Sequence, residues 1–272
     1  MAHRTGDVTS SMRKLFRGAK TFIGMVHLPP LPGSPRYAGK LEQVFEHTLD
    51  NARTLVEGGV DGLLVENFGD APFHKYVEPV TVSVMAIAVR DIARAAKIPV
   101  GVNVLRNDAR AALSIAATAG ARFIRINVHT GAMVTDQGII EGRADDTLRL
   151  RRELAADVAI FADVFVKHAF PIGAQSLEQS AKDTAFRGLA DALVISGAAT
   201  GEAADLDEVR RVRSVVGDFP ILVGSGTTLD NVSQVLHLAD GVIVGTALKI
   251  HGDVRNPVDP ERVRAFRARI PR

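Results

Sequence analysis

Eight short apolar runs, rich in β-branched residues, alternate with longer stretches of helical pattern along the 272 residues. Short apolar runs bounded by turn residues are typical of buried parallel strands. We predict strands at 21–26, 62–67, 100–105, 123–129, 159–166, 192–196, 221–225 and 241–245. Helices are predicted at 40–57, 79–96, 107–119, 144–155, 177–189, 205–215, 228–238 and 258–269. Few folds accommodate this alternation.

Several predicted helices carry start and stop signals. Asp205 and Thr228 stand where N-cap residues are expected. Four glycines stand where helices would end, namely Gly58, Gly120, Gly188 and Gly217. Eight βα units with short connections predict an α/β protein with a single-domain (β/α)8 TIM barrel over residues 21–272. A doubly wound open sheet is the alternative.

Composition excludes several classes of protein. The chain contains no cysteine, which excludes disulfide frameworks, thiol catalysis and zinc sites built from cysteine. Its net charge of +2 is too balanced for a dedicated nucleic-acid binder, so we expect no nucleic-acid partner. No apolar run is long enough for a membrane span, and residues 1–20 lack the apolar centre of a signal peptide. We therefore expect a cytoplasmic protein.

The small net charge conceals two basic ends. Residues 1–20 and residues 255–272 each carry a charge of +4, so the part between them carries −6. For the 1–20 segment, a helix that closes the bottom of the barrel is one interpretation. The basic ends are interpreted as solvated segments, with peripheral contact to a membrane or another anionic partner as the alternative.

In a TIM barrel the chemistry lies at the carboxyl ends of the strands. His27 ends the first predicted strand and precedes a stiff, proline-rich loop. Glu66 and Asn67 end the second strand, and Asn103 lies on the third. These side chains are candidates for the site, although two interior amides such as Asn103 and Asn127 can also bond each other.

Alternation along the fourth and fifth strands predicts further interior polar groups. In FIRINVH it directs Arg125, Asn127 and His129 into the barrel. In FADVFVKHA it places Asp163 inside, as a partner for Arg125 or a catalytic group, with Lys167 and His168 at the mouth. The catalytic candidates are His27, Glu66, Asn127, His129, Asp163, Lys167 and His168. No cofactor is assured; a divalent metal held by His27, Glu66, His129, Asp163 and His168 is an alternative without diagnostic spacing.

The last three strands end in glycine-rich turns. In barrels the loops after strands seven and eight commonly bind a phosphate, and glycine permits close approach of the backbone. Here a helix start near Thr228 would add free N–H groups, and Lys249 would reach the same anion. The candidate substrate- and phosphate-binding residues are Asn67, Asn103, Ser196, Gly197, Gly224, Ser225, Gly226, Thr227, Gly245, Thr246 and Lys249.

Three segments carry a resemblance to a known family: MVHLPPLPGSP, GVDGLLVENFGDAPF and FADVFVKHA. With them the chain resembles the BtpA/SgcQ family over nearly its whole length. The resemblance implies a TIM barrel with motif positions His27, Glu66, Asn67, Asp163, Lys167 and His168, without assigning catalytic roles. It links the family to biogenesis of a photosynthetic membrane complex, and through sugar-operon members to metabolism.

Three functions follow. The first is an enzyme of isomerase or lyase type that acts by acid/base chemistry on a phosphorylated sugar, nucleoside or related metabolite. The second is hydrolysis of an N-glycosidic bond. The third is a non-catalytic factor in biogenesis of the photosynthetic complex. We expect a small-molecule substrate and a homo-oligomer.

Overall fold

Eight parallel strands close into a barrel in this protein. The computed structural model describes residues 12, 14–16, 18–166, 169–197 and 205–271. Around the barrel the strands follow the order β1-β11-β10-β9-β7-β4-β3-β2. They are β1 (Thr21–His27), β2 (Gly62–Glu66), β3 (Val100–Asn103), β4 (Phe123–Ile126), β7 (Ala159–Val164), β9 (Ala192–Ile195), β10 (Ile221–Val223) and β11 (Gly241–Val244). The predicted barrel is confirmed, and the open sheet is excluded because β1 pairs with both β2 and β11.

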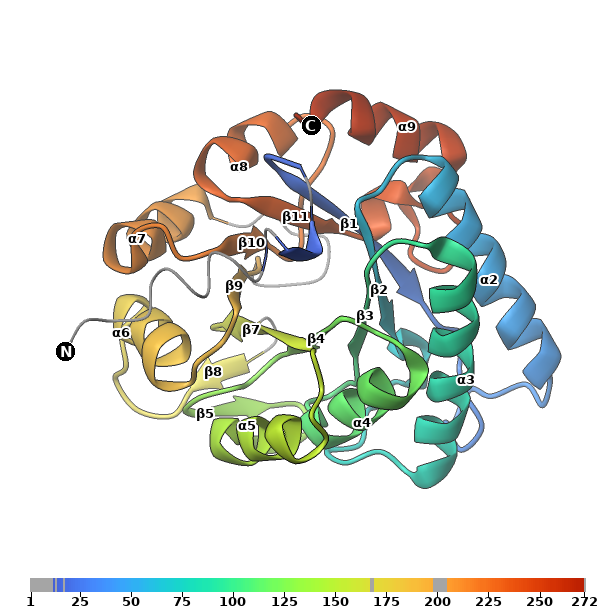
Figure 1. Cartoon of the computed structure of the whole chain (residues 1–272), viewed down its shortest axis with the longest axis horizontal. Helices are drawn as coiled ribbons and strands as arrows, with labels where there is room; N and C mark the ends of the chain where they lie inside the picture. The colour runs from blue at the N-terminus through green and yellow to red at the C-terminus, as the bar shows by residue number, and fades with distance from the viewer. Residues whose placement is uncertain (1–11, 13, 17, 167–168, 198–204, 272) are drawn as a thin grey trace.

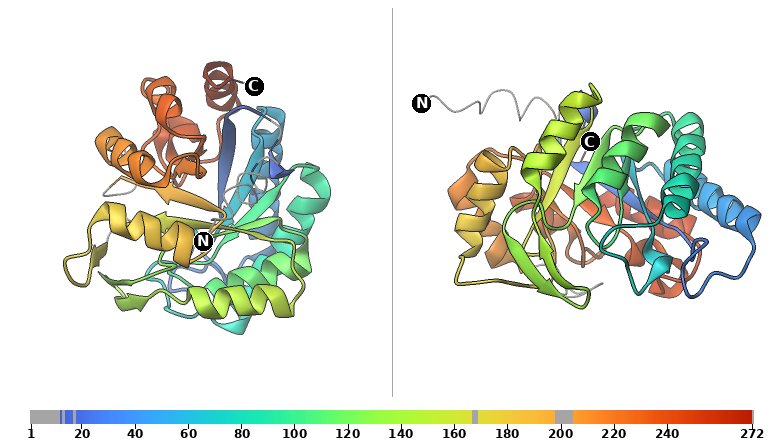
Figure 2. Two further views of the ribbon diagram at one scale, coloured as in Figure 1. Left: turned by 60° about the vertical axis from the view of Figure 1, so that its left-hand side comes forward. Right: turned by 90° about the horizontal axis from the view of Figure 1, so that it is seen from below.

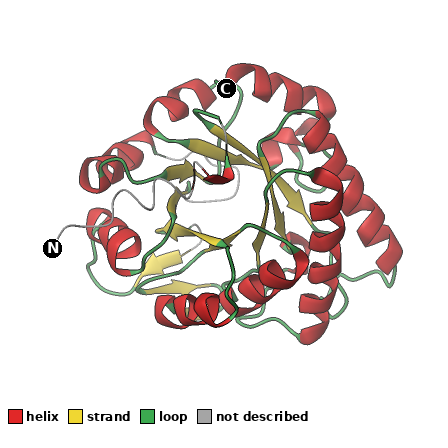
Figure 3. Cartoon of the chain, in the orientation of Figure 1, coloured by secondary structure: helices red, strands yellow, loops and turns green. Residues whose placement is uncertain are grey.

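Helices surround the strands as an outer ring (Figures 1 and 3). In the described part of the chain the α-helices are α2 (Leu41–Glu57), α3 (Pro79–Ala96), α4 (Ala109–Ala119), α5 (Ala144–Glu153), α6 (Leu177–Lys182), α7 (Leu206–Val216), α8 (Val232–Leu238) and α9 (Pro260–Arg269). Short turns are η1 (Phe68–Asp70), η3 (Thr246–Leu248) and η4 (Ile250–Gly252), and α6 continues as the π-helical η2 (Asp183–Arg187). The four predicted glycine stops and the Asp205 cap are confirmed.

The predicted start of α8 at Thr228 is wrong. The helix begins at Val232, with Asn231 as its N-cap. The Thr228 N–H donates to Asn231 Oδ1 at 2.8 Å, and Asn231 Nδ2 donates to the Gly226 carbonyl at 3.0 Å. The Asn231 side chain folds the preceding residues into a single turn, closed by the Val232 N–H and the Thr228 carbonyl at 3.0 Å, and the regular helix starts only after this turn.

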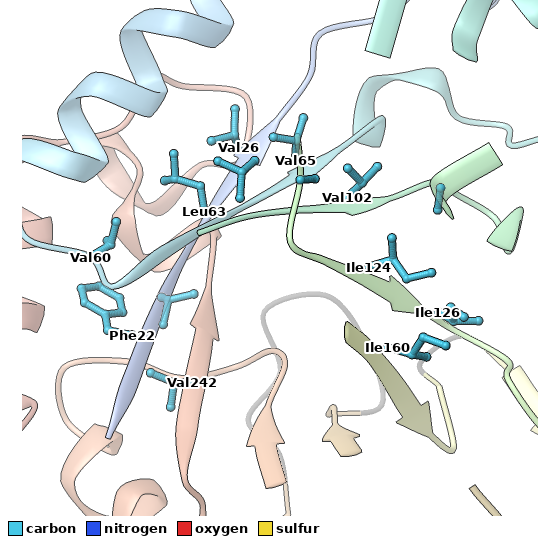
Figure 4. Close-up of a cluster of buried hydrophobic side chains, with 14 of the residues drawn as sticks. Phe22, Val26, Val60, Leu63, Val65, Val102, Ile124, Ile126, Ile160 and Val242 are labelled. Carbon is cyan, nitrogen blue, oxygen red and sulfur yellow. The ribbon is translucent and has the colours of Figure 1, made fainter. Parts of the chain in front are cut away.

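The alternation of apolar residues builds two layers of core. Between strands and helices lie the outward side chains, including Val65, Val102, Ile124 and Ile160 (Figure 4). Inside the barrel a second cluster contains Phe123 and Phe161, whose ring centroids are 4.7 Å apart. Phe16, from the segment before β1, packs on both rings at 5.9 and 6.4 Å. The barrel interior is therefore solid beneath its mouth.

A second, three-stranded antiparallel sheet was not predicted. It contains β5 (Ala132–Thr135), β6 (Gly138–Glu141) and β8 (Ala169–Pro171), in the order β6-β5-β8. The β5–β6 hairpin follows β4 and extends from one end of the barrel (Figure 2). Met133 and Ile140 of this sheet pack on Val128 and Val166, so the segments after β4 and β7 turn toward it instead of continuing the barrel.

Candidate functional site

A cavity of about 430 Å³ opens at the carboxyl ends of β1, β2, β10 and β11. This volume lies in the range of small-molecule sites, about 300–1,000 Å³. Its lining includes predicted residues from these four strand ends, namely His27, Glu66, Gly224, Ser225, Gly226, Thr227, Gly245 and Thr246, together with Arg125 of β4. The structure thus brings two of the predicted catalytic residues, His27 and Glu66, together with part of the predicted phosphate-binding set, where this fold carries its chemistry.

Arg125 and Asp163 form a buried ion pair beside the cavity. Arg125 Nε and Nη2 donate to the two oxygens of Asp163 at 2.8 and 2.9 Å. Asn127 Nδ2 donates to the same carboxylate at 3.0 Å, and Arg125 Nη2 also donates to Ser196 Oγ at 3.1 Å. Burial lowers the pKa of Arg125, but the charge of Asp163, its hydrogen bonds and the charge of Glu66 together outweigh burial, so the pKa is raised. The guanidinium is therefore a fixed positive charge in the cavity wall.

A second cluster of polar side chains comes from β1, β2 and β3. Asn103 Nδ2 donates to Glu66 Oε2 at 2.8 Å. His27 Nε2 lies 3.9 Å from Glu66 Oε1, and each of these two side chains is about one-tenth exposed. The His27 ring also contacts the Phe68 ring, with centroids 4.7 Å apart. His27 and Glu66 thus present a titratable pair to the cavity, with Asn103 orienting the carboxylate.

The loops after β10 and β11 form facing walls of the cavity. The backbone N–H groups of Gly226, Thr227, Thr246 and Ala247 have no acceptor within the described residues. Thr227 is buried, and its Oγ1 has no hydrogen-bond partner there either. Unpaired backbone donors at a cavity are suited to an anion with several acceptor oxygens. Because α8 begins only at Val232, the Gly226 and Thr227 donors belong to a loop, whereas Thr246 and Ala247 begin the short 3-10 turn η3.

Three predicted substrate-binding residues act as supports. Asn67 accepts from the Leu105 N–H at 2.7 Å and donates to Asp70 Oδ2 at 3.1 Å, so it joins the loops after β2 and β3. Ser196 bonds Arg125, and the Gly197 N–H donates to Ser225 Oγ at 3.0 Å. These residues hold the cavity wall without lining the cavity.

His129 is not in the barrel interior, so the predicted alternation fails there. Strand β4 ends at Ile126, and the chain turns outward. His129 is buried, its Nε2 lies 2.8 Å from the Gly188 carbonyl oxygen, and burial lowers its pKa. The side chain lines a separate cavity of about 70 Å³ with Ile126 and Thr147.

Lys249 does not reach the predicted anion site. Its side chain is 1% exposed and does not line the cavity. Its Nζ lies 3.4 Å from Asn51 Oδ1 on α2, and burial lowers its pKa to about 8. The short turn η3 directs the chain out of the barrel before residue 249, which explains the difference.

Lys167 and His168 lie outside the described residues. Within the part of the chain that is described, no three side chains from His, Asp and Glu are grouped to hold a metal ion. The proposed metal set is also dispersed, because His129 lies outside the barrel.

Sequence reasoning missed two arginines. Arg106 is buried just beyond β3. Burial lowers the pKa of its guanidinium, and the charges of Asp163, Asp136 and Glu66 offset only part of this effect. Arg106 directly follows the strand predicted at 100–105, so a search for polar residues at strand ends that extended one residue further would have found it. Arg262 lines the cavity from α9, and no local pattern distinguishes it from the other arginines of that helix.

Comparison with known proteins identifies relatives over most of the chain. Residues 18–272 match the family described as the BtpA family. The Photosystem I biogenesis protein BtpA of Synechocystis is 49% identical over 252 residues, covering 92% of this chain and 88% of that protein. An uncharacterized mitochondrial protein of Caenorhabditis elegans is 36% identical over 263 residues, covering 93% and 94% of the two chains.

Solved structures share the fold at low identity. Phosphoribosyl anthranilate isomerase from Thermococcus kodakaraensis superposes with a TM-score of 0.54 at 16% identity, covering 92% of this chain and 98% of that one. Orotidine 5'-phosphate decarboxylase from Pyrococcus horikoshii gives 0.54 at 14% identity, covering 91% and 98%. None of the helices in the described part of the chain is long and apolar enough to cross a membrane.

Proposed function

The chain belongs to the BtpA family, and we propose that its barrel mouth is the active site of an enzyme acting on a phosphorylated small metabolite. The observation that carries the proposal is the single cavity shared by two glycine-rich loops and the His27–Glu66 pair. The phosphate lies between the loops after β10 and β11. The carbon skeleton points to the barrel axis.

The chain's own residues supply acid/base chemistry of isomerase or lyase type. His27 and Glu66 move a proton at the substrate carbon, because they are the titratable pair that lines the cavity beside the phosphate loops. Arg125 stabilises negative charge that develops on a substrate oxygen. Asp163 holds Arg125 in place and is a positioning residue, since both of its oxygens already accept hydrogen bonds.

A ligand screen tests the phosphate site. Sugar phosphates and nucleoside monophosphates are added to the purified chain, and melting temperature is followed by scanning fluorimetry. A free ligand concentration of about 100 times the dissociation constant stabilises the folded protein by about 2.7 kcal/mol. Such a stabilisation raises the melting temperature clearly. Binding of the unphosphorylated sugar or nucleoside with equal strength, or no shift with any compound, would refute the phosphate site.

The proton-transfer role is tested on the substrate found by that screen. His27→Asn and Glu66→Gln should each lower kcat by about 10²–10⁴-fold while ligand binding persists. His237→Gln and Glu153→Gln are matched controls on exposed helix surfaces and should leave kcat unchanged. Full activity in both site variants would remove these residues from the mechanism, and release of a free base would favour N-glycosidic hydrolysis.

A second candidate function is assembly of a photosynthetic complex, which the name of the Synechocystis relative favours. Complementation of a Synechocystis strain lacking that relative separates the two. If the wild-type chain restores photosystem I in that strain, a catalytic role predicts that the Glu66→Gln variant does not restore it. Equal restoration by Glu66→Gln supports the non-catalytic function.

A further inference from the structure

The cavity does not stop at the proposed phosphate loops. At the barrel end it is lined by Met25, His27, Glu66, Arg125 and Ile243. At the other end it is lined by Leu229 and Asp230, which precede α8, and by Arg262 and Phe266 of α9. Helices α8 and α9 are neighbours in the outer ring (Figure 1). The cavity lining therefore extends from the barrel interior, past the two loops, to residues just before α8 and residues of α9.

The late start of α8 leaves this outer end open. A helix starting at Thr228 would place its first turn directly behind the phosphate loop. Instead, Asn231 bonds the Thr228 N–H and the Gly226 carbonyl, and residues 228–231 form a turn. Leu229 and Asp230 consequently line the cavity. A site that bound only a terminal phosphate would not need a cavity that extends beyond the two loops.

The outer end carries one acceptor and one cation. Asp230 is exposed, and its carboxylate forms no hydrogen bond or ion pair with another described side chain. Its carboxylate repels a terminal phosphate and accepts from hydroxyl groups. Arg262 is half-buried, with Nη1 3.3 Å from the Ala247 carbonyl oxygen and Nε 3.7 Å from Asp259 Oδ2. A guanidinium held beside η3 is suited to a phosphate oxygen.

We propose that the ligand carries its phosphate internally and is a nucleoside diphosphate derivative. This inference rests on the proposed function and names its substrate class. The reacting substituent lies at His27 and Glu66, and the diphosphate lies between the two loops with Arg262 against its second phosphate. Asp230 accepts from the ribose hydroxyl groups at the outer end of the cavity. Asp230 and Arg262 thus determine specificity without touching the reacting atoms.

Isothermal titration of the full chain with two pairs of probes tests this. Glucose 1-phosphate is compared with UDP-glucose, and ribose 5-phosphate with ADP-ribose. In at least one pair the diphosphate should bind about tenfold more tightly, a difference of about 1.4 kcal/mol. Arg262→Gln and Asp230→Asn should each remove most of that difference.

Exposed residues nearby provide the controls. Arg264→Gln on the same helix and Asp218→Asn before β10 should alter neither affinity. If monoesters bind and no diphosphate binds more tightly, the inference is overturned while the proposed function stands. Tighter diphosphate binding that survives both Arg262→Gln and Asp230→Asn also overturns it. If neither member of either pair binds, both this inference and the proposed phosphate site are overturned.

Discussion

Arg125 and Asp163 show what a strand pattern can predict about single residues. They occupy interior positions of adjacent strands; alternation predicted an ion pair as one of two roles for Asp163, and the structure shows the ion pair. The Arg125 side chain is 3% exposed and the Asp163 side chain 0%, so solvent does not screen the interaction as it screens a surface ion pair. Removing one partner leaves a buried, uncompensated charge.

Replacing the acid of this pair should therefore be costly. Asp163→Asn should lower the free energy of unfolding by about 3–5 kcal/mol, measured by urea denaturation. Asp157→Asn is the matched control, because Asp157 pairs with Arg122 at 2.8 Å on the surface with a side chain 95% exposed. That control should change stability by less than about 1 kcal/mol. Similar losses in the two variants would contradict the buried-charge argument.

At the scale of elements, the last loop is joined to the first helix of the barrel. Asn51 of α2 accepts from the Val258 N–H at 2.7 Å and from Lys249 Nζ at 3.4 Å. Lysine is rarely buried without a charged partner, and desolvation is the cause of its lowered pKa. This contact spans about 200 residues of sequence, so no local pattern predicts it.

Lys249 should make stability depend on alkaline pH. Its pKa falls from 10.5 in the unfolded chain to about 8 in the folded one, so the unfolded chain binds more protons between these values. Stability attributable to Lys249 therefore rises from pH 8 to pH 10.5, by up to about 3 kcal/mol.

Chemical denaturation at several pH values tests this dependence. Lys249→Met should remove the rise, whereas Lys182→Met on the exposed side of α6 should keep it. Parallel pH curves for wild type and Lys249→Met would show that Lys249 does not titrate in this range.

The β6-β5-β8 sheet shows the limit of local reasoning about elements. Val134 pairs with Ile139 on one side and with Phe170 on the other. All three side chains are exposed, so the segments lack the clear apolar-inside alternation that indicates a half-buried strand. Their pairing depends on β8 returning after β7, which only the closed barrel brings near β5.

At the scale of the whole molecule, a side chain from the segment before β1 completes the packing of the barrel interior. Phe16 is 4% exposed and packs on Phe123 and Phe161 of the interior. A side chain from before the first strand thus completes the packing under the site. That the basic segment 1–20 acts as a unit closing the barrel stays a prediction.

Truncating this aromatic residue should destabilise the fold without touching the mouth. Phe16→Ala should lower the free energy of unfolding by about 3–5 kcal/mol, as large-to-small changes at aromatic core positions do. Phe170→Ala is the matched control, since Phe170 is 76% exposed on β8. Differential scanning calorimetry compares the two variants. A fall in melting temperature for Phe170→Ala equal to that for Phe16→Ala would contradict this role of Phe16.

The amino-acid sequence by itself determined the barrel, its eight strands and the strand ends that carry His27, Glu66 and the glycine-rich loops. These features follow from local periodicity and turn residues, which act over a few positions. Tertiary structure alone decided that His129 and Lys249 leave the site, that α8 starts at Val232, and that Arg262 enters the cavity from α9. Such placements depend on contacts between residues far apart in the chain, where packing and burial override local pattern.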